Sequence, residues 1–251
     1  MSQLALITGG SRGLGRAGAL ALADQGVDII VTYHQNQSAA QQVVAEIEAK
    51  GRKALALQCD TRDVASFAAF AEQLQTSLKS HFGRERLDYL LNNAGTGIHA
   101  MVEQTSVEQL DEMYNIHVKG PFFFTQAILD LIEKGGHIVN VSSGLARFTF
   151  PGSGPYAMAK GAVEVMTRYM AKEFAARGIR VNTLAPGAIA TDFRGGAIRD
   201  NDQAQTMVAS VTALGRVGEA EDIGKIIAGL FSQGFEWVTG QRIEASGGMM
   251  L

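Results

Sequence analysis

Short runs of hydrophobic and β-branched residues alternate along the chain with longer stretches in which apolar residues recur at helical spacing. The short runs cover residues 4–8, 28–32, 54–58, 88–91, 137–141, 180–184 and 242–244. The amphipathic stretches between them cover residues 38–50, 64–79, 107–133, 157–177 and 221–232. Strands that alternate with helices of this length predict a parallel sheet with helices on both faces. We therefore expect an α/β, doubly wound fold with about seven strands.

One segment departs from this alternation. Residues 188–208 are polar, contain the pair Gly195-Gly196 and directly follow an expected strand. In an open parallel sheet, the segments that leave the carboxyl ends of the strands form the ligand crevice. We therefore expect a substrate lid at about residues 188–210. No linker, low-complexity tract or internal repeat divides the rest of the sequence, which predicts a single domain over residues 1–251.

Composition and charge exclude several classes of partner. Of the 251 residues 46% are hydrophobic, and 22 basic against 25 acidic residues give a net charge of −3. This balance provides no positive field that would attract a nucleic acid or an anionic membrane. Nowhere do apolar residues run together over the ~18 positions that indicate a membrane-spanning helix. We expect neither nucleic acid nor membrane as a partner.

The cysteine and histidine content indicates the compartment and argues against a metal site. Cys59 is the single cysteine, so it cannot form an intrachain disulfide. The first residues contain no basic segment or cleavage site typical of a secretory leader. We therefore expect a reducing, cytoplasmic location. The five histidines show no metal-ligand spacing, so no metal is expected.

A glycine-rich segment, Thr8-Gly9-Gly10-Ser11-Arg12-Gly13-Leu14-Gly15, follows the first expected strand and precedes a helical run. Glycines let the backbone turn sharply and bring its N–H groups close to a pyrophosphate at a helix N-terminus. The spacing differs from the common GxGxxG pattern, and an ordinary strand-to-helix turn is the alternative interpretation. Its place in the first βα unit favours dinucleotide binding.

The end of the second expected strand indicates which dinucleotide binds. A carboxylate there would bind the ribose 2′-OH of NAD and repel a 2′-phosphate. The sequence at this point contains Tyr33 and His34 and no acidic residue, whereas Arg12 in the glycine-rich segment offers a guanidinium to a phosphate. These residues favour NADP(H) over NAD(H), with a merely solvated Arg12 as the alternative.

From Thr8 to Gly15 the sequence resembles the short-chain dehydrogenase/reductase family, whose members have a Rossmann-like fold. Further motifs follow in that family's order over nearly the whole chain. They are Asn92-Asn93-Ala94-Gly95, Asn115, Ser142-Ser143, Tyr156-Ala157-Met158-Ala159-Lys160 and Pro186-Gly187-Ala188-Ile189-Ala190-Thr191. None of these motifs is specific for the family by itself, but their joint occurrence in the same order is specific for it.

The resemblance implies a catalytic set of Asn115, Ser143, Tyr156 and Lys160. In that family the tyrosine exchanges a proton with the substrate oxygen, and the lysine also hydrogen-bonds the nicotinamide ribose. The serine binds the carbonyl, and the asparagine positions a water that joins the lysine to solvent. The expected cofactor contacts are Gly9, Ser11, Arg12, Gly13, Leu14, Gly15, Tyr33, His34, Asp60, Thr61, Asn93, Ala94, Gly95, Tyr156, Lys160, Pro186, Gly187, Ile189 and Thr191.

The spacing of Tyr156 and Lys160 gives a chemical reason for these roles. A free phenol has a pKa of about 10, too high for a base at neutral pH. Lys160 lies one helical turn further along the same face, and a cation at about 4 Å contributes a gross ~4 kcal/mol at an effective dielectric near 20. We therefore expect the lysine to bring the pKa of the phenol toward neutral pH.

Two adjacent serines, Ser142 and Ser143, compete for the carbonyl-binding role. Successive strand residues point in opposite directions, so only one of them can face the substrate. The spacing of Ser143 from Tyr156 matches the family, which favours Ser143. Further along, Arg147, Phe148 and Phe150 either face the substrate or lie on the loop surface.

These residues predict an NADP(H)-dependent oxidoreductase that reduces a carbonyl to an alcohol, or the reverse, by hydride transfer, and a 3-oxoacyl substrate is compatible with them. The alternative is a non-catalytic dinucleotide-binding regulatory or scaffold protein, against which the complete catalytic set argues. An enoyl reductase of the same superfamily would have its tyrosine and lysine farther apart. The resemblance also implies a homotetramer, in agreement with the apolar helices expected at 107–133 and 157–177.

Overall fold

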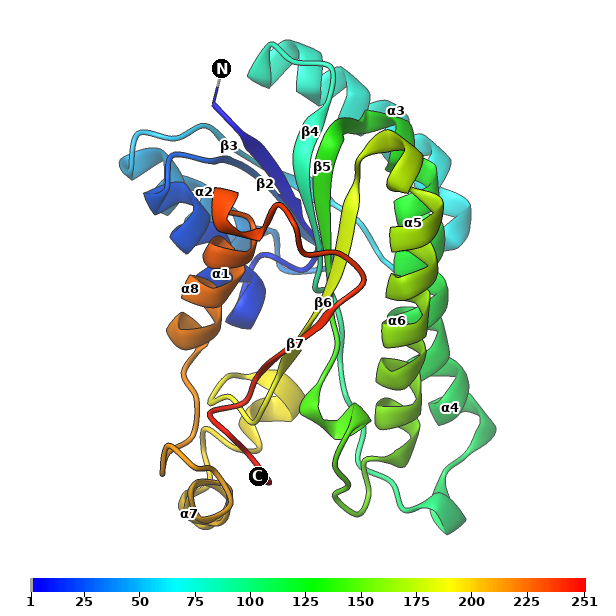
Figure 1. Cartoon of the computed structure of the whole chain (residues 1–251), viewed down its shortest axis with the longest axis vertical. Helices are drawn as coiled ribbons and strands as arrows, with labels where there is room; N and C mark the ends of the chain where they lie inside the picture. The colour runs from blue at the N-terminus through cyan, green and yellow to red at the C-terminus, as the bar shows by residue number, and fades with distance from the viewer. Residues whose placement is uncertain (1) are drawn as a thin grey trace.

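The computed structural model describes residues 2–251 and is built around one parallel sheet with strand order β3-β2-β1-β4-β5-β6-β7 (Figure 1). The strands are β1 (Leu4–Ile7), β2 (Asp28–Tyr33), β3 (Ala54–Gln58), β4 (Leu87–Asn92), β5 (Ile132–Val141), β6 (Arg180–Pro186) and β7 (Arg242–Ala245). The α-helices are α1 (Gly13–Asp24), α2 (Gln37–Ala49), α3 (Phe67–Ser77), α4 (Val107–Tyr114), α5 (Gly120–Ile128), α6 (Gly154–Glu173), α7 (Asp202–Ser210) and α8 (Ala220–Leu230). The doubly wound α/β fold expected from the sequence is confirmed.

Alternate residues of the central strands pack against two different helix layers. In β1, Ala5 and Ile7 belong to a core shared with α1, α2 and α8, whereas Leu4 and Leu6 belong to a core shared with α3, α5 and α6. Figure 1 shows the two layers on either side of the sheet. Because both faces of the strands are buried, the strands are apolar at nearly every position, which is typical of parallel sheets.

The prediction of one long helix over residues 107–133 is wrong, because the segment is divided. The segment folds as α4, a π-helical turn (Asn115–Lys119) and α5, and its last two residues already belong to β5. Pro121 lies in the first turn of α5, where its missing N–H interrupts a continuous α-helical ladder. π-Turns inside helices frequently mark functional sites, and this one begins at Asn115.

All strands run in the same direction, so their carboxyl ends meet at one edge, the lower end of the sheet in Figure 1. The expected lid segment leaves β6 at this edge and folds as a 3-10 turn (Phe193–Gly196) and α7. Among residues 2–251, no helix combines the length and apolar character needed to cross a bilayer. The fold therefore gathers the ends of β1, β4, β5 and β6 into one crevice.

Candidate functional site

The turn between β1 and α1 is tied to the end of β4. The Thr8 hydroxyl accepts hydrogen bonds from the backbone N–H groups of Asn93 and Ala94, at 2.9 and 3.0 Å. The Asn93 amide in turn donates to the carbonyls of Thr8 and Gly9, at 2.9 and 3.1 Å. These four hydrogen bonds hold the glycine-rich turn in place directly in front of the N-terminus of α1.

The glycines of this turn are required by its close packing. Gly9 has a φ of +64°, and a Cβ there would lie 2.9 Å from the Cα of Ala94. A Cβ at Gly10 would lie 2.6 Å from Cγ1 of Val31. The turn thus forms a close-packed cradle at a helix N-terminus, where a pyrophosphate binds favourably. The residues expected to hold a dinucleotide fit that group.

Near the expected adenosine end, Arg12 forms an ion pair with Asp192 of the lid segment, at 2.7 Å, and its side chain is 68% exposed. His34 is exposed at the end of β2, and its Nε2 lies 3.3 Å from the Asp60 carboxylate. Hydrogen bonds from Arg62 lower the pKa of Asp60. The ring of Tyr33, also expected here, packs in the core on the α1 side. No acidic side chain follows directly after β2.

The segment after β6 returns to the glycine-rich turn. Gly187 donates to the Ala245 carbonyl at 3.1 Å, and a Cβ there would lie 2.8 Å from Cα of Ser246. Further along, Cβ of Thr191 lies 4.0 Å from the position that a Cβ at Gly13 would take. The structure therefore brings Thr191, one of the expected cofactor contacts, beside the turn in front of α1.

Tyr156 and Lys160 lie on α6 beside the end of β5. The Lys160 ammonium is buried and donates a hydrogen bond to the Val141 carbonyl, at 2.7 Å. Its Nζ lies 5.6 Å from the centre of the Tyr156 ring. Ser143, which follows Val141 by two residues, is also buried and contacts Tyr156. The expected catalytic serine, tyrosine and lysine are therefore neighbours.

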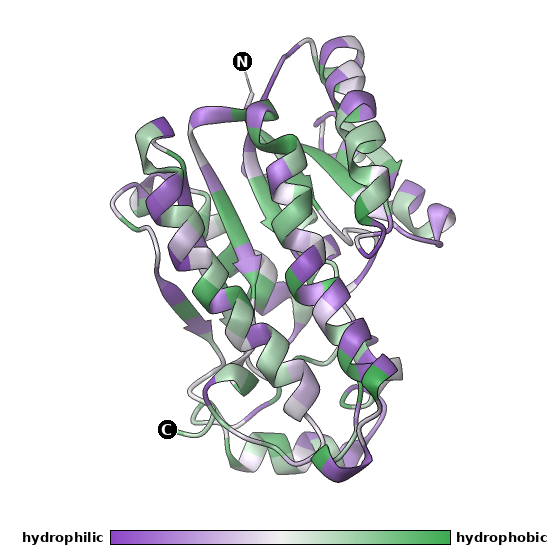
Figure 2. Ribbon diagram, turned by 90° about the vertical axis from the view of Figure 1, so that its right-hand side faces the viewer, coloured by the Kyte–Doolittle hydropathy of each residue, from purple (hydrophilic) through white to green (hydrophobic). Residues whose placement is uncertain are grey.

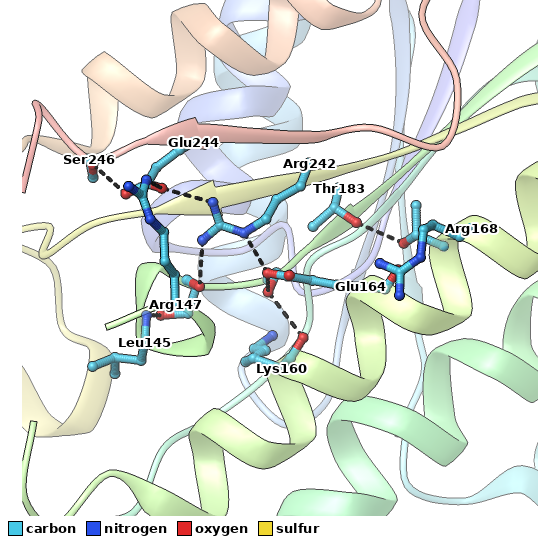
Figure 3. Close-up of polar contacts among 12 residues, drawn as sticks. Leu145, Arg147, Lys160, Glu164, Arg168, Thr183, Arg242, Glu244 and Ser246 are labelled. Carbon is cyan, nitrogen blue, oxygen red and sulfur yellow. Dashed lines mark hydrogen bonds and ion pairs between the residues drawn. The ribbon is translucent and has the colours of Figure 1, made fainter. Parts of the chain in front are cut away.

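The structure distinguishes the two serines. The Ser142 hydroxyl is turned away from Tyr156 and lies within hydrogen-bonding distance of the Glu164 carboxylate, at 2.9 Å, and of the Lys160 carbonyl, at 3.1 Å. The Ser143 Oγ accepts a hydrogen bond from the Leu145 backbone N–H, at 3.2 Å (Figure 3). The Ser143 hydroxyl also contacts the Tyr156 phenol, so of the two serines Ser143 is the one beside Tyr156.

Burial dominates the titration of both catalytic groups on α6. It raises the pKa of Tyr156 to about 12, although the Ser143 hydroxyl and the Arg194 charge oppose this rise. Burial also lowers the pKa of Lys160 to about 7. The expectation that the lysine charge brings the phenol toward neutral pH is therefore wrong for the protein without cofactor. The ammonium is directed at a carbonyl and is itself partly neutral at pH 7.

Two residues beside Tyr156 were missed in the sequence. His117 is buried, and its ring packs edge-on against the Tyr156 ring at a centroid distance of 5.1 Å. Burial and the nearby Lys160 hold the pKa of His117 well below its usual range, so the imidazole is neutral. Phe193 of the lid segment lies 5.7 Å from Tyr156 on another side. Both contacts depend on the π-turn and on the lid conformation, which no local pattern indicates.

Other candidate residues are used elsewhere in the fold. Phe148 and Phe150 pack against Val208 of α7 and Met249, and Arg147 pairs with Glu244 at 2.9 Å. These three residues therefore contact the lid and β7 in this structure. Burial raises the pKa of the Cys59 thiol to about 12, which makes it unreactive. The part of the chain that the structure describes contains no cluster of metal-ligating side chains.

Comparison with known proteins agrees with this site. A family model described as enoyl-(acyl carrier protein) reductase matches residues 9–250. The 3-oxoacyl-[acyl-carrier-protein] reductase of a Synechocystis species is 35% identical over 254 aligned residues, which cover 100% of this chain and 98% of the relative.

Solved structures of keto-reductases have the same fold throughout. The promiscuous reductase LugOII, which catalyses keto-reduction at C1 during lugdunomycin biosynthesis, superposes with a TM-score of 0.93 at 39% identity. That match covers 99% of this chain and 98% of the other. The angucycline C-6 ketoreductase LanV with bound NADP superposes with a TM-score of 0.92 at 34% identity, over 99% and 95% of the two chains.

The low pKa of Lys160 predicts a particular pH dependence of stability. Between its folded pKa of about 7 and its ordinary value of 10.5, the unfolded chain binds a proton that the folded chain does not. The free energy of unfolding of the parent protein should therefore rise relative to that of Lys160→Met as pH rises, by about 2 kcal/mol from pH 7 to 9. Urea unfolding of both proteins without cofactor measures this difference.

The control for this measurement is Lys172→Met, which removes an exposed lysine from the same helix. Its stability difference from the parent protein should stay constant over the same range. If the stability difference between the parent protein and Lys160→Met is equally constant, the pKa of Lys160 has its ordinary value and the prediction of a lowered pKa is wrong.

Proposed function

The chain belongs to the short-chain dehydrogenase/reductase family and is an NAD(P)-dependent oxidoreductase acting on carbonyl groups, and from this premise we propose that Tyr156 is its acid–base residue. The observation that carries the proposal is the position of the phenol, which contacts Ser143 and has the buried Lys160 one turn further along α6. A binding protein without turnover has no use for this arrangement.

Each residue of the site has a separate task. The nicotinamide, when bound, supplies or accepts the hydride. Ser143 donates a hydrogen bond to the substrate oxygen, keeps its own proton and stabilises the charge that develops on that oxygen. Tyr156 donates its proton to the same oxygen during reduction. Lys160 holds the nicotinamide ribose, and Asn115, at the start of the π-turn, positions a water that connects Lys160 to solvent.

Replacing Tyr156 by Phe removes the phenolic oxygen and keeps the ring that packs against His117 and Phe193. General acid–base catalysis typically contributes 10²–10⁴-fold, so Tyr156→Phe should lower kcat at least ~10²-fold with little change in cofactor affinity. Lys160→Ala should lower kcat and also weaken the binding of the cofactor. Steady-state kinetics and fluorescence titration with NADPH measure the two effects.

The control is Tyr169→Phe, which removes an exposed phenol from the same helix and should leave kcat unchanged. A Tyr156→Phe enzyme with most of the parent activity would contradict the assignment and leave Ser143 or a water as the proton donor.

We also propose that NADP(H) is preferred over NAD(H). Arg12 borders the cradle, its side chain is largely exposed, and no carboxylate directly follows β2 to repel a 2′-phosphate. The Asp60 carboxylate, which lies just after β3, accepts a hydrogen bond from Arg62 and lies near His34. A guanidinium–phosphate contact contributes about 1.5–3 kcal/mol, or roughly 10- to 100-fold in affinity.

Arg12→Gln should therefore weaken NADPH binding about 10- to 100-fold and change NADH binding little. Arg16→Gln is the matched control, because Arg16 lies one turn further along α1 and pairs with Glu46 at 2.6 Å. Fluorescence titration of the three proteins with both cofactors provides the test. Equal affinities of the parent protein for NADPH and NADH would refute the preference.

The substrate is a small-molecule carbonyl compound, and we propose that residues 188–210 form a lid over it. Phe193, in this segment, covers one side of Tyr156. The segment ends in α7, which packs on Phe148 and Phe150. The named relatives are a 3-oxoacyl-[acyl-carrier-protein] reductase, a reductase that catalyses keto-reduction at C1 during lugdunomycin biosynthesis, and an angucycline C-6 ketoreductase. The direct assay of substrate class is therefore to measure NADPH oxidation with a panel of compounds that contains both 3-oxoacyl thioesters and polycyclic aromatic ketones.

Two separate apolar surfaces support a homotetramer. The first lies on α4, α5 and α6, the helix layer that faces the viewer in Figure 2. Its exposed large side chains are Leu110, Tyr114, Phe122, Phe123, Val165 and Tyr169. The second lies along the edge strand β7, where the exposed Trp237 precedes the strand and the exposed Leu251 follows it. Two different self-complementary surfaces generate a tetramer with two-fold symmetry.

Light scattering at micromolar concentration should therefore give about four times the chain mass of 26.7 kDa. Phe123→Glu combined with Val165→Glu should split the assembly, because each places a charge on the apolar helix surface. Ala68→Glu, at an exposed position of α3, is the control and should leave the mass unchanged. A parent protein of monomer mass would refute the proposal.

A further inference from the structure

A chain of charged side chains connects β7, the last strand, to the catalytic helix α6. Arg242 of β7 donates from Nε to Glu164 of α6, at 2.7 Å, and from Nη1 to Glu244, at 2.8 Å. Arg147, in the loop after β5, donates to the same Glu244 oxygen, and Ser246 donates to the other one. Figure 3 shows Arg242 in the middle of this group, between the two carboxylates.

The central ion pair is well shielded from solvent. The Arg242 and Glu164 side chains are only 22% and 16% exposed. Partial burial of two charges carries a desolvation cost that reduces or cancels their attraction, so such a pair is weak evidence for stability alone. The contacts that the pair makes indicate a role other than stability.

The pair also holds the end of β5. The Ser142 hydroxyl lies 2.9 Å from the same Glu164 oxygen that accepts from Arg242. The Arg242 Nη2 reaches the Ser143 carbonyl at 3.4 Å, a long hydrogen bond. Arg242 thereby contacts the Ser143 carbonyl directly and the Ser142 hydroxyl through Glu164. Ser143 is the residue whose hydroxyl contacts Tyr156.

We propose that Arg242 and Glu164 are positioning residues that set the Ser143 hydroxyl relative to Tyr156. Glu164 lies eight residues, about two helical turns, beyond Tyr156 on α6, so the pair joins the helix that holds the phenol to the strand that holds the serine. This proposal rests on the proposed function, because it assumes that Ser143 binds the substrate oxygen. A shift of about 1 Å in such a group can cost as much as 10²-fold in rate.

The test is a double-mutant cycle between Arg242→Gln and Ser143→Ala. Arg242→Gln should lower kcat about tenfold in the parent enzyme and less than about twofold in the Ser143→Ala enzyme, where there is no hydroxyl to position. The affinity for NADPH should change little in both. Glu164→Gln should reproduce the loss, and the double variant Glu164→Gln, Arg242→Gln should be no worse than either single variant.

Arg168→Gln is the matched control. Arg168 lies one turn beyond Glu164 on the same helix, is exposed and bonds only the Glu164 backbone carbonyl, so its loss should leave kcat unchanged. Melting temperatures of all variants separate a loss of fold from a loss of positioning. If Arg242→Gln does not fold, Arg242→Lys takes its place in the cycle, since it retains the charge and loses the forked geometry.

An equal loss of kcat from Arg242→Gln with and without Ser143 would overturn the proposal, as would a loss that appears only in cofactor affinity. Tyr156→Phe is measured in parallel. A Tyr156→Phe enzyme that stays active contradicts the proposed acid–base function, whereas the cycle between Arg242 and Ser143 still reports on positioning.

Discussion

The burial of the Lys160 ammonium is the constraint around which the site is arranged. A cation in the interior needs hydrogen-bond partners, and this one has the Val141 carbonyl. The contact fixes one turn of α6 against the end of β5. The turn before carries Tyr156, which contacts Ser143, and the turn after carries Glu164, which contacts Ser142. Three successive turns of α6 therefore hold the last residue of β5 and the two residues that follow it.

This arrangement favours the phenol as an acid. With its pKa raised to about 12, Tyr156 keeps its proton at neutral pH and can give it to an oxygen that becomes an alkoxide during reduction. The opposite direction requires a phenolate, which burial disfavours. A charge at 4 Å would offset part of this cost, but Lys160 is half neutral at pH 7 and is directed at a carbonyl. The buried phenol is therefore suited to donate a proton during reduction.

Much of the fold and of this site could be predicted from the sequence, because the signals are local. Strand alternation and the glycine-rich turn depend on neighbouring residues, and the Tyr156–Lys160 spacing is one helical turn. The ambiguous stretch was 107–133, where a π-turn and a short connection to β5 interrupt an apolar pattern that is otherwise helical. The choice of Ser143 over Ser142 was predicted from spacing, and the side-chain hydrogen bonds agree with it.

What could not be predicted are contacts between residues far apart in the chain. Arg242 and Glu164 are separated by 78 positions, and each belongs to an element whose own pattern explains its presence as an ordinary surface charge. The edge-on packing of His117 against Tyr156 depends equally on tertiary structure, since the π-turn sets the direction of the imidazole. Local patterns reveal which residues can do chemistry, and tertiary contacts decide how those residues are oriented.

The ion pair between Arg12 and Asp192 illustrates how such contacts compete with function. Arg12 is the residue best placed for a 2′-phosphate, yet its guanidinium contacts a lid carboxylate at 2.7 Å. Exposed pairs of this kind contribute only about 0–1 kcal/mol, whereas a charge-assisted contact to a phosphate contributes about 1.5–3 kcal/mol. On these magnitudes the Arg12–Asp192 ion pair is too weak to argue against the proposed preference for NADP(H). Because Asp192 belongs to the segment that also contains Phe193, the same ion pair connects the glycine-rich turn to the residues beside Tyr156.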